Sequence, residues 1–276
     1  MIELISKFQE KIGGTLGIYA KNLYTKNILA FNEHEIFPSA SVIKIFILYT
    51  FFKKVEEKKI LLKDFIAFSK KNLVPDSPYF EKNDLDVEKI TFYDIARSMI
   101  IVSDNTSTNL LIDFLTFNEI NKDIKFLGLK NTILQRKMYD FESREKGIDN
   151  FITPYESFLF LEYIVNTLNN SKIKYDLDSI KNFDIYNIDT PNYVSLATIK
   201  IMSEQEDLEK IPFAFKDKNY FIANKPGELP NIRNDVSLII KENIPYIINI
   251  FTKNIHDELK TDTIISEIAK FLVENL

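Results

Sequence analysis

The stretch that most constrains the fold is a long apolar run preceded by a short polar approach. Residues 37–44 read Phe-Pro-Ser-Ala-Ser-Val-Ile-Lys, and residues 45–52 continue Ile-Phe-Ile-Leu-Tyr-Thr-Phe-Phe. Because the second part is apolar on every side, it predicts a central, buried helix rather than an amphipathic surface helix. The rest of the chain must therefore pack around this helix.

The first turn of that helix carries Ser41 and, three residues later, Lys44. On a helix this spacing places the hydroxyl and the amine on one face, within reach of each other. A lysine in apolar surroundings has a lowered pKa, because burial disfavours its charged form, and it can then act as a base toward a hydroxyl. The helix N-terminus also offers free backbone N–H groups close to where an oxyanion would form.

The same Ser-x-x-Lys pattern occurs twice more, at Ser143/Lys146 and at Ser171/Lys174. Both of these pairs lie in polar, charged stretches that are typical of loops, so we interpret them as chance matches. Only Ser41 and Lys44 precede a buried helix. Taken alone, that pair is explained equally well by an ordinary helix N-terminus.

Composition narrows the class of protein. The chain has 276 residues, of which 45% are hydrophobic, and these values indicate a globular protein of one large domain or two lobes. Its net charge of −5 gives no reason to expect nucleic acid or an anionic membrane as a partner. With no cysteine and only His34 and His256, we expect no disulfide, metal or cofactor, and neither histidine has a context that suggests a catalytic triad.

The N-terminal segment bears on location. Residues 1–11 are amphipathic and include acidic residues, unlike the basic start and continuous apolar region of a secretory signal. No apolar run approaches the length of a membrane span. We therefore expect a cytoplasmic location, or a periplasmic or secreted one if a leader precedes this sequence in nature. Separately, we expect a monomer whose partner is a small molecule.

Strand patterns lie at both ends of the chain and helical patterns dominate between them, from about Leu61 to Met202. The predicted strands cover residues 14–20, 27–31, 220–223, 236–240 and 246–251, with a hairpin turn over residues 21–26. We predict an α+β fold in which one antiparallel sheet, flanked by helices, carries an inserted all-helical lobe. The expected division is residues 1–58 with 205–276 for the sheet lobe and 59–204 for the helical lobe, with the site between them.

Several helix boundaries have local signals. Thr91 precedes a helical pattern and is followed three residues later by Asp94, which predicts a capping box. Pro154 after Thr153 predicts a helix start, and residues 257–275 have the spacing of an amphipathic helix. The charged residues 135–153 predict a long surface loop.

Three motifs occur together in one order. Ser41-x-x-Lys44 is followed by Ser103-Asp104-Asn105, and then by Lys225-Pro226-Gly227 just after a predicted strand. This combination resembles the serine β-lactamase and penicillin-binding superfamily, and most closely the class A β-lactamases. The segments that continue the resemblance are residues 37–41, 103–111, 210–212, 225–230 and 233–236, so it covers nearly the whole chain.

The resemblance implies a serine hydrolase with a defined set of roles. Ser41 would be the nucleophile that forms an acyl-enzyme, and Lys44 would help to take its proton. Ser103 would relay a proton toward the leaving nitrogen, and Lys225 would supply positive potential across the cleft. The implied binding residues are Asn105 for a substrate amide, Gly227 in the third motif, the backbone N–H of Glu228 with that of Ser41 for the oxyanion, and Arg233 for a substrate carboxylate.

Arg233 and Asp104 have other interpretations. A surface ion pair is an equal alternative for Arg233, whose planar fork otherwise suits a carboxylate. We interpret Asp104 as structural rather than catalytic.

The sequence departs from the family pattern in two places. Pro226 stands where the family has threonine or serine, which removes a hydroxyl expected to bind the substrate carboxylate and a backbone N–H. The family also has a glutamate before the Thr-Pro helix start, where it activates the water that releases the acyl group. If Arg136 and Asn150 match the two ends of that loop, Met138 occupies the position of the glutamate.

Asp140 and Glu142 lie close by and are the candidate general bases, with solvated loop charges as the alternative. The predicted function is therefore a class A β-lactamase-like hydrolase of β-lactam or related amide and ester bonds, with slow deacylation. The alternatives are a cytoplasmic esterase or peptidase on the same fold, and a non-catalytic binding protein that has lost turnover.

Overall fold

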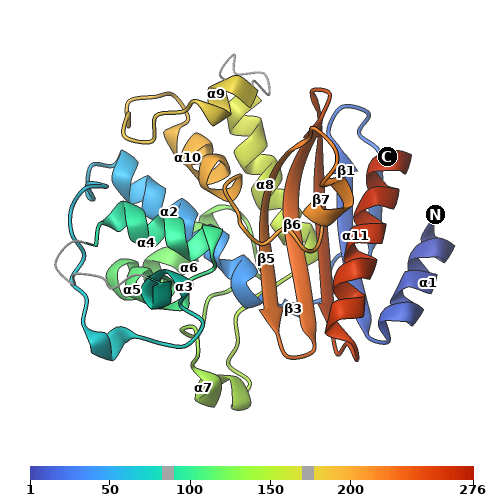
Figure 1. Cartoon of the computed structure of the whole chain (residues 1–276), viewed down its shortest axis with the longest axis horizontal. Helices are drawn as coiled ribbons and strands as arrows, with labels where there is room; N and C mark the ends of the chain where they lie inside the picture. The colour runs from blue at the N-terminus through green and yellow to red at the C-terminus, as the bar shows by residue number, and fades with distance from the viewer. Residues whose placement is uncertain (83–89, 170–176) are drawn as a thin grey trace.

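A computed structural model describes residues 1–82, 90–169 and 177–276 (Figure 1). The Ser171/Lys174 pair lies outside the described residues. The helices are α1 Ile2–Ile12, α2 Lys44–Glu56, α3 Pro78–Lys82, α4 Phe92–Ile101, α5 Asn105–Leu115, α6 Phe117–Phe126, α7 Phe141–Glu145, α8 Pro154–Asn169, α9 Leu177–Lys181, α10 Tyr193–Met202 and α11 Glu258–Asn275, with 3-10 turns η1 Ala40–Ile43, η2 Lys70–Asn72 and η3 Pro212–Phe215. The strands are β1 Thr15–Asn22, β2 Ile28–Phe31, β3 Phe37–Pro38, β4 Phe151–Ile152, β5 Phe221–Leu229, β6 Ile232–Lys241 and β7 Ile244–Lys253.

The central sheet is antiparallel and joins both ends of the chain. Its strand order is β2-β1-β7-β6-β5, so β1 near the N-terminus pairs with β7 near the C-terminus. A short two-stranded ribbon, β3 with β4, lies apart from it. The predicted α+β architecture, a sheet flanked by helices with an inserted helical part, is confirmed.

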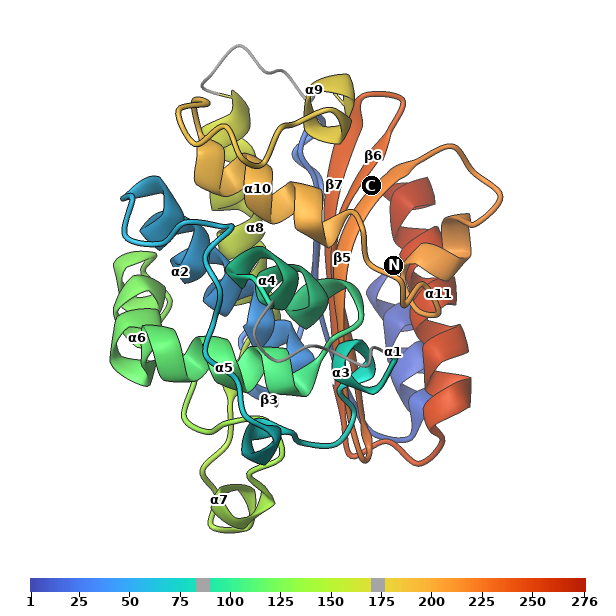
Figure 2. The same cartoon turned by 60° about the vertical axis from the view of Figure 1, so that its left-hand side comes forward.

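Two hydrophobic cores cover the two faces of the sheet. On one face α1 and α11 pack against the strands, and the helices of the middle of the chain cover the other face (Figures 1 and 2). The central helix α2 packs among α4, α5, α6 and α10, and its residues from Lys44 to Phe52 are buried. The division at residues 58/59 and 204/205 stays a prediction, and α2 packs mainly with helices of the inserted segment.

Local signals predicted the starts of three helices. Thr91 caps α4, and a capping box joins it to Asp94. The other helix starts expected from sequence are also confirmed: α8 begins at Pro154, and Asp257 caps α11. A left-handed Gly13, with φ of 72°, ends α1.

Four of the five strand predictions were too short, and the prediction for residues 27–31 was one residue too long. Residues 225–227 lie inside β5 rather than after a strand, because its pairing with β6 continues from Phe221 to Leu229. The predicted turn over residues 21–26 begins too early, since β1 pairs with β7 as far as Asn22. The segment 135–153 is not wholly a loop, because it contains the short helix α7 and strand β4.

Candidate active site

A cavity of about 380 Å³ opens beside Ser41, and we call it the Ser41 cavity. Its lining comes from η1, the start of α5, the segment 136–150, the end of β5 with the turn after it, and the start of α11. A neighbouring cavity of about 210 Å³, the Ser103 cavity, shares Ser41, Asp76, Asn105 and Glu228 with it. The Ser103 cavity is completed by Pro78, Val102, Ser103, Asp207 and Pro226.

Ser41 lies in η1, directly before the buried helix α2. The turn begins at Ala40 with φ of 47°, and the N–H of Val42 donates to the carbonyl of Ser39 at 3.1 Å. Ser41 stays partly exposed although its neighbours on both sides are buried. The fold thus holds one hydroxyl of an otherwise buried segment at the cavity wall.

The hydroxyl of Ser103 lies between two buried lysines. Lys44 Nζ donates to Ser103 Oγ at 3.1 Å, and Lys225 Nζ donates to it at 3.0 Å. Lys44 also donates to the carbonyl of Ser103 at 2.7 Å and to Asn105 Oδ1 at 2.9 Å, while Lys225 donates to the carbonyl of Pro226 at 2.9 Å. Elements far apart in the sequence therefore bring together three of the four predicted catalytic side chains, and Ser41 lines the same two cavities.

Burial changes the acidity of both amines. The pKa of Lys44 is lowered well below its usual value, first by burial and then by the charge of Lys225. Burial likewise lowers the pKa of Lys225, to about 7. Both side chains are fully buried. Lys44 therefore reaches the neutral, proton-accepting form more easily than an exposed lysine.

The second motif has one structural residue, Asp104, and two cavity-lining residues, Ser103 and Asn105. Asp104 is buried and caps α5, accepting from the N–H groups of Ser107 at 2.7 Å and Tyr79 at 3.0 Å, which agrees with the structural interpretation. Asn105 accepts from Lys44 and donates through Nδ2 to the carbonyl of Asp76 at 3.0 Å.

Gly227 brings β5 against η1. A Cβ added there would lie 2.9 Å from the carbonyl oxygen of Ser39 and 3.0 Å from the backbone nitrogen of Ser41, which is closer than such atoms normally approach. Only glycine permits this contact without a shift of the strand. Pro226 lies in β5, which is an edge strand of the sheet, where proline is tolerated better than in a central strand.

The segment between Arg136 and Asn150 is held at both ends. Arg136 Nε donates to Asp149 Oδ1 at 2.7 Å, and both side chains are buried. The backbone N–H of Arg136 donates to Asn150 Oδ1 at 3.0 Å, and Asn150 Nδ2 donates back to the carbonyl of Arg136 at 3.1 Å.

Met138 is fixed inside this segment. Asn109 on α5 accepts from the N–H of Met138 at 2.8 Å and donates to its carbonyl at 3.0 Å. Met138 lines the Ser41 cavity, so the segment presents a thioether to it.

Asp140 and Glu142 do not line either cavity. Asp140 caps α7, accepting from the N–H and the hydroxyl of Ser143 at 3.0 and 2.7 Å, and these bonds lower its pKa. Glu142 pairs with Lys146 at 2.6 Å, and its side chain is 80% exposed. Their role as general bases stays a prediction.

Arg233 lies at the other end of the Ser41 cavity. Its guanidinium pairs with Glu258 at 2.5 Å and, through Nε, with Asp262 at 3.5 Å. It also donates to the carbonyls of Leu229 and Ile232. Arg233 is ion-paired and also borders the cavity, so both the ion-pair interpretation and the carboxylate-binding interpretation stay open.

Four residues at the site were missed from sequence: Asp76, Asn109, Asp207 and Lys210. Asn109 could have been predicted from the sequence, because it lies one helical turn after Asn105 and shares its face of α5. Asp76 lines both cavities and accepts a hydrogen bond from the hydroxyl of Tyr139. Nothing in the sequence separates Asp76 from an ordinary loop acid, because the contact joins residues far apart in the chain.

The described residues lack a metal-binding cluster and a membrane-spanning helix. Over residues 1–82, 90–169 and 177–276, no group of three or more His, Cys, Asp or Glu is placed to hold a metal ion. Within the same ranges, no helix has the length and apolar character needed to cross a membrane. The expectations about cofactors, location and oligomeric state stay predictions.

The sequence pattern of the beta-lactamase enzyme family matches residues 2–182 and 194–276. The chain belongs to this family. Beta-lactamase BRO-1 of Moraxella catarrhalis is 26% identical over 266 residues, which cover 93% of this chain and 75% of that protein. A beta-lactamase of Bacillus amyloliquefaciens is 24% identical over 274 residues, or 98% of this chain and 82% of the relative.

Solved structures agree with the family. An ancestral class A beta-lactamase superposes with a TM-score of 0.81 at 20% identity, covering 99% of both chains. A PBP-A variant, solved as an acyl-enzyme complex with penicillin G, superposes with a TM-score of 0.79 at 21% identity, covering 99% of this chain and 96% of that one. The expected class A β-lactamase-like fold and serine hydrolase class are confirmed.

Proposed function

We propose that this β-lactamase family member forms an acyl-enzyme at Ser41 with β-lactams or related amides and esters, and releases the acyl group slowly. The observation that carries the proposal is the placement of the Ser103 hydroxyl between the amines of Lys44 and Lys225, beside the cavity that Ser41 lines. Nucleophilic catalysis requires a partly exposed hydroxyl near a group that can accept its proton, and the lowered pKa values of Lys44 and Lys225 favour their neutral, proton-accepting forms.

During acylation the proposed catalytic residues act one after another. Neutral Lys44 takes the proton of Ser41 as Oγ forms a bond to the substrate carbonyl carbon, and the N–H groups of Ser41 and Glu228 stabilise the oxyanion. The bond from carbon to the leaving nitrogen or oxygen then breaks. Ser103 gives its proton to the leaving atom and regains one from protonated Lys44, with the charge of Lys225 favouring the transfer. Asn105 binds a substrate amide near the nucleophile.

Deacylation lacks an evident base. Water attacks an ester efficiently only when a nearby group accepts its proton, and the thioether of Met138 is a poor proton acceptor. Asp140 and Glu142 are not among the residues that line the two cavities. The acyl-enzyme is therefore expected to persist, so that the protein behaves as a slow β-lactamase or is trapped by β-lactams.

The test is intact mass spectrometry over time after mixing the protein with penicillin G or a chromogenic cephalosporin. The wild-type chain should gain the mass of the acyl group, and Ser41→Ala should gain none. Ser143→Ala is the matched control, because Ser143 belongs to the loop copy of the same motif, and it should acylate like the wild type. An adduct on Ser41→Ala, or none on the wild type with either compound, would refute the proposal.

The esterase alternative rests on a separate observation. Pro226 supplies no hydroxyl for a substrate carboxylate, and the neighbouring Glu228 adds a negative charge at the same edge of the cavity. An uncharged ester meets neither obstacle. Faster acylation by a neutral ester than by penicillin G would favour this alternative.

A further inference from the structure

A further cavity, of about 530 Å³, lies outside the candidate active site, and we call it the lysine pocket. It is bordered by the end of α9, the end of α10, the segment 203–208, the turn η3 and the start of β5. Within the described part of the chain, it shares no lining residue with the Ser41 cavity or the Ser103 cavity. The lysine pocket is therefore a separate concave surface that the proposed reaction does not use.

The apolar part of its lining is mostly aromatic. Phe215 and Phe221 are buried, and the ring of Phe215 contacts the ring of Tyr220 with 5.4 Å between centroids. Phe213 is 48% exposed and Leu208 is 50% exposed, although both line a concave surface. Exposed aromatic and aliphatic carbon in a cavity of this size favours a ligand with a flat apolar body.

The charged part of the lining is basic. The pocket is lined by four lysines, namely Lys181, Lys200, Lys216 and Lys218. Glu204 is the only acid among the lining residues that the structure describes. Its carboxylate already pairs with Arg97 at 2.8 Å and with Lys200 at 3.1 Å, so it does not neutralise the other three lysines.

Those three lysines have no carboxylate partner. Over residues 1–82, 90–169 and 177–276, none of Lys181, Lys216 and Lys218 forms an ion pair. Lys216 Nζ instead lies 4.3 Å above the centroid of the Phe213 ring, which places a positive charge at the aromatic wall. A ligand anion that binds these ammonium groups would not have to displace a protein carboxylate.

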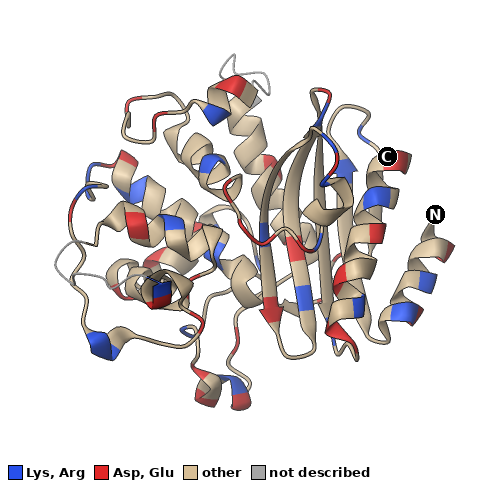
Figure 3. Ribbon diagram, viewed as in Figure 1, with Lys and Arg blue, Asp and Glu red and all other residues tan. Residues whose placement is uncertain are grey.

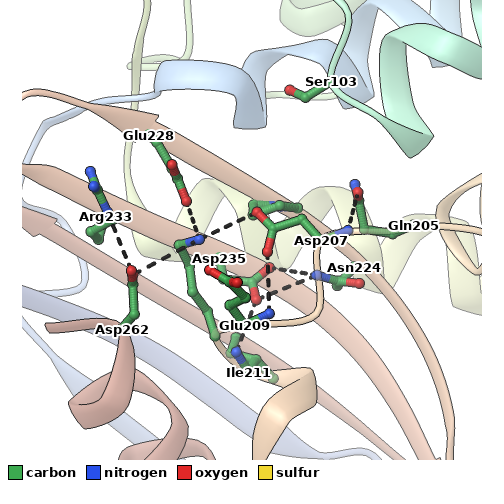
Figure 4. A network of polar contacts seen from close by, with 12 residues as sticks. Ser103, Gln205, Asp207, Glu209, Ile211, Asn224, Glu228, Arg233, Asp235 and Asp262 are labelled. Atoms are coloured by element: carbon green, nitrogen blue, oxygen red, sulfur yellow. Dashed lines mark hydrogen bonds and ion pairs between the residues drawn. The ribbon is translucent and has the colours of Figure 1, made fainter. Parts of the chain in front are cut away.

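Other lysines of the chain have acids as neighbours. The fully buried ammonium of Lys210 contacts Glu228, Asp207 at 3.4 Å and Asp262 at 3.9 Å (Figure 4). Along α11 acidic and basic residues are interspersed (Figure 3). The lysine pocket differs from both places, because its positive charge is left without a counter-charge from the protein.

We infer that the lysine pocket binds a small aromatic carboxylate or sulfonate, with its ring against Phe213 and Tyr220 and its anionic group beside the unpaired lysines. The aromatic wall buries the ring, and the ammonium groups supply the opposite charge. A neutral ring lacks the second contribution and an inorganic anion lacks the first. This inference does not depend on the proposed function.

The experiment uses a tryptophan as a local reporter. The chain contains no tryptophan, so Phe213→Trp places a single indole in the lysine pocket. The probe is 1-anilinonaphthalene-8-sulfonate, and binding is followed by energy transfer from the indole to the probe. Phe126→Trp is the control for position, because Phe126 is 75% exposed on α6 and does not line the pocket, and it should give weaker transfer.

The contribution of charge is tested in the Phe213→Trp protein. Lys216→Gln combined with Lys218→Gln should weaken binding of the sulfonate by about tenfold, and about 0.5 M salt should reduce this effect. Binding of N-phenyl-1-naphthylamine, which has the same rings without the sulfonate, should not change. Lys125→Gln combined with Lys130→Gln is the matched control, because these lysines line another cavity, and it should leave binding of both probes unchanged.

Three results would overturn the inference. The first is an unchanged affinity for the sulfonate in the Lys216→Gln, Lys218→Gln protein. The second is an equal loss of affinity for the sulfonate and for the neutral amine in that protein, because the lysines would then not act through charge. The third is energy transfer from Phe126→Trp as strong as that from Phe213→Trp, which would place the probe elsewhere.

Discussion

At the scale of single residues, the proposed slow release of the acyl group depends on Met138. The backbone of Met138 exchanges two hydrogen bonds with the side chain of Asn109, and the residue lines the Ser41 cavity. The proposed acylating residues do not include it. In the proposed function, this one side chain therefore separates a protein that acylates from one that also hydrolyses its acyl-enzyme.

Met138→Glu should shorten the lifetime of the acyl-enzyme. A carboxylate at this position would accept a proton from the attacking water, and general-base catalysis of this kind contributes about a hundredfold or more. The lifetime of the penicillin G adduct, followed by intact mass, measures the effect. Asp140→Asn and Glu142→Gln serve as controls and should leave the wild-type lifetime unchanged. A longer-lived adduct in either control would show that the loop acid does reach the water.

At the scale of elements, the position of the segment 136–150 depends on the contacts that join its two ends. Arg136 and Asp149 form a buried ion pair, and Arg144 also contacts Asp149 at 3.1 Å. The pair ties the two ends together and thus positions Met138 between them. Surface contacts such as Lys146 with Glu142 contribute little, because water screens them.

Arg136→Gln should destabilise the protein by about 3 kcal/mol, because it breaks the buried ion pair and leaves Asp149 with Arg144 and the N–H of Asn150 as its remaining partners. Lys146→Ala, in the same segment, should change stability by less than about 0.5 kcal/mol. Urea unfolding of both variants measures the difference. Equal losses in the two variants would mean that the buried pair does not hold the segment.

At the scale of the whole molecule, buried charges should make stability depend on pH. Asp235 is fully buried, accepts from the N–H of Ile211 at 3.0 Å, and has a pKa raised to about 7, chiefly by burial. Because the folded state holds this proton more tightly than the unfolded state, the stabilisation is complete below pH 4 and is lost as pH rises toward 7. Burial lowers the pKa of Lys225 to about 7, so below that pH its buried charge reduces the stability of the folded state. Above that pH the stability rises again.

Asp235→Asn should remove the loss of stability that is expected as the pH rises toward 7. Between pH 5 and pH 7 the wild type is expected to lose about 2 kcal/mol relative to the variant, from about 1.4 kcal/mol per pH unit over the window. Urea unfolding at the two pH values measures the difference. A constant gap between wild type and variant would place the folded-state pKa of Asp235 outside this window.

Much of the fold followed from local pattern. The apolar run after Lys44 predicted the buried helix α2, and the capping residue Thr91 fixed the start of α4. Strand lengths were underestimated, since the polar residues 225–227 do not look like a strand. Their pairing with β6 is a long-range contact, which no window of neighbouring residues contains.

The sequence predicted the fold class and the enzyme class, and it supplied the proposed set of acylating residues, because three motifs in one order are far more specific than any one of them. How those residues face one another follows only from the folded chain. Packing directs Lys44 and Lys225 to Ser103, leaves Asp140 and Glu142 out of the lining of both cavities, and gathers Asp207 and Glu228 around Lys210. The direction and the burial of these side chains arise from packing between segments that are far apart in the sequence. They set the charges of the site, and for that reason a local sequence pattern does not predict them.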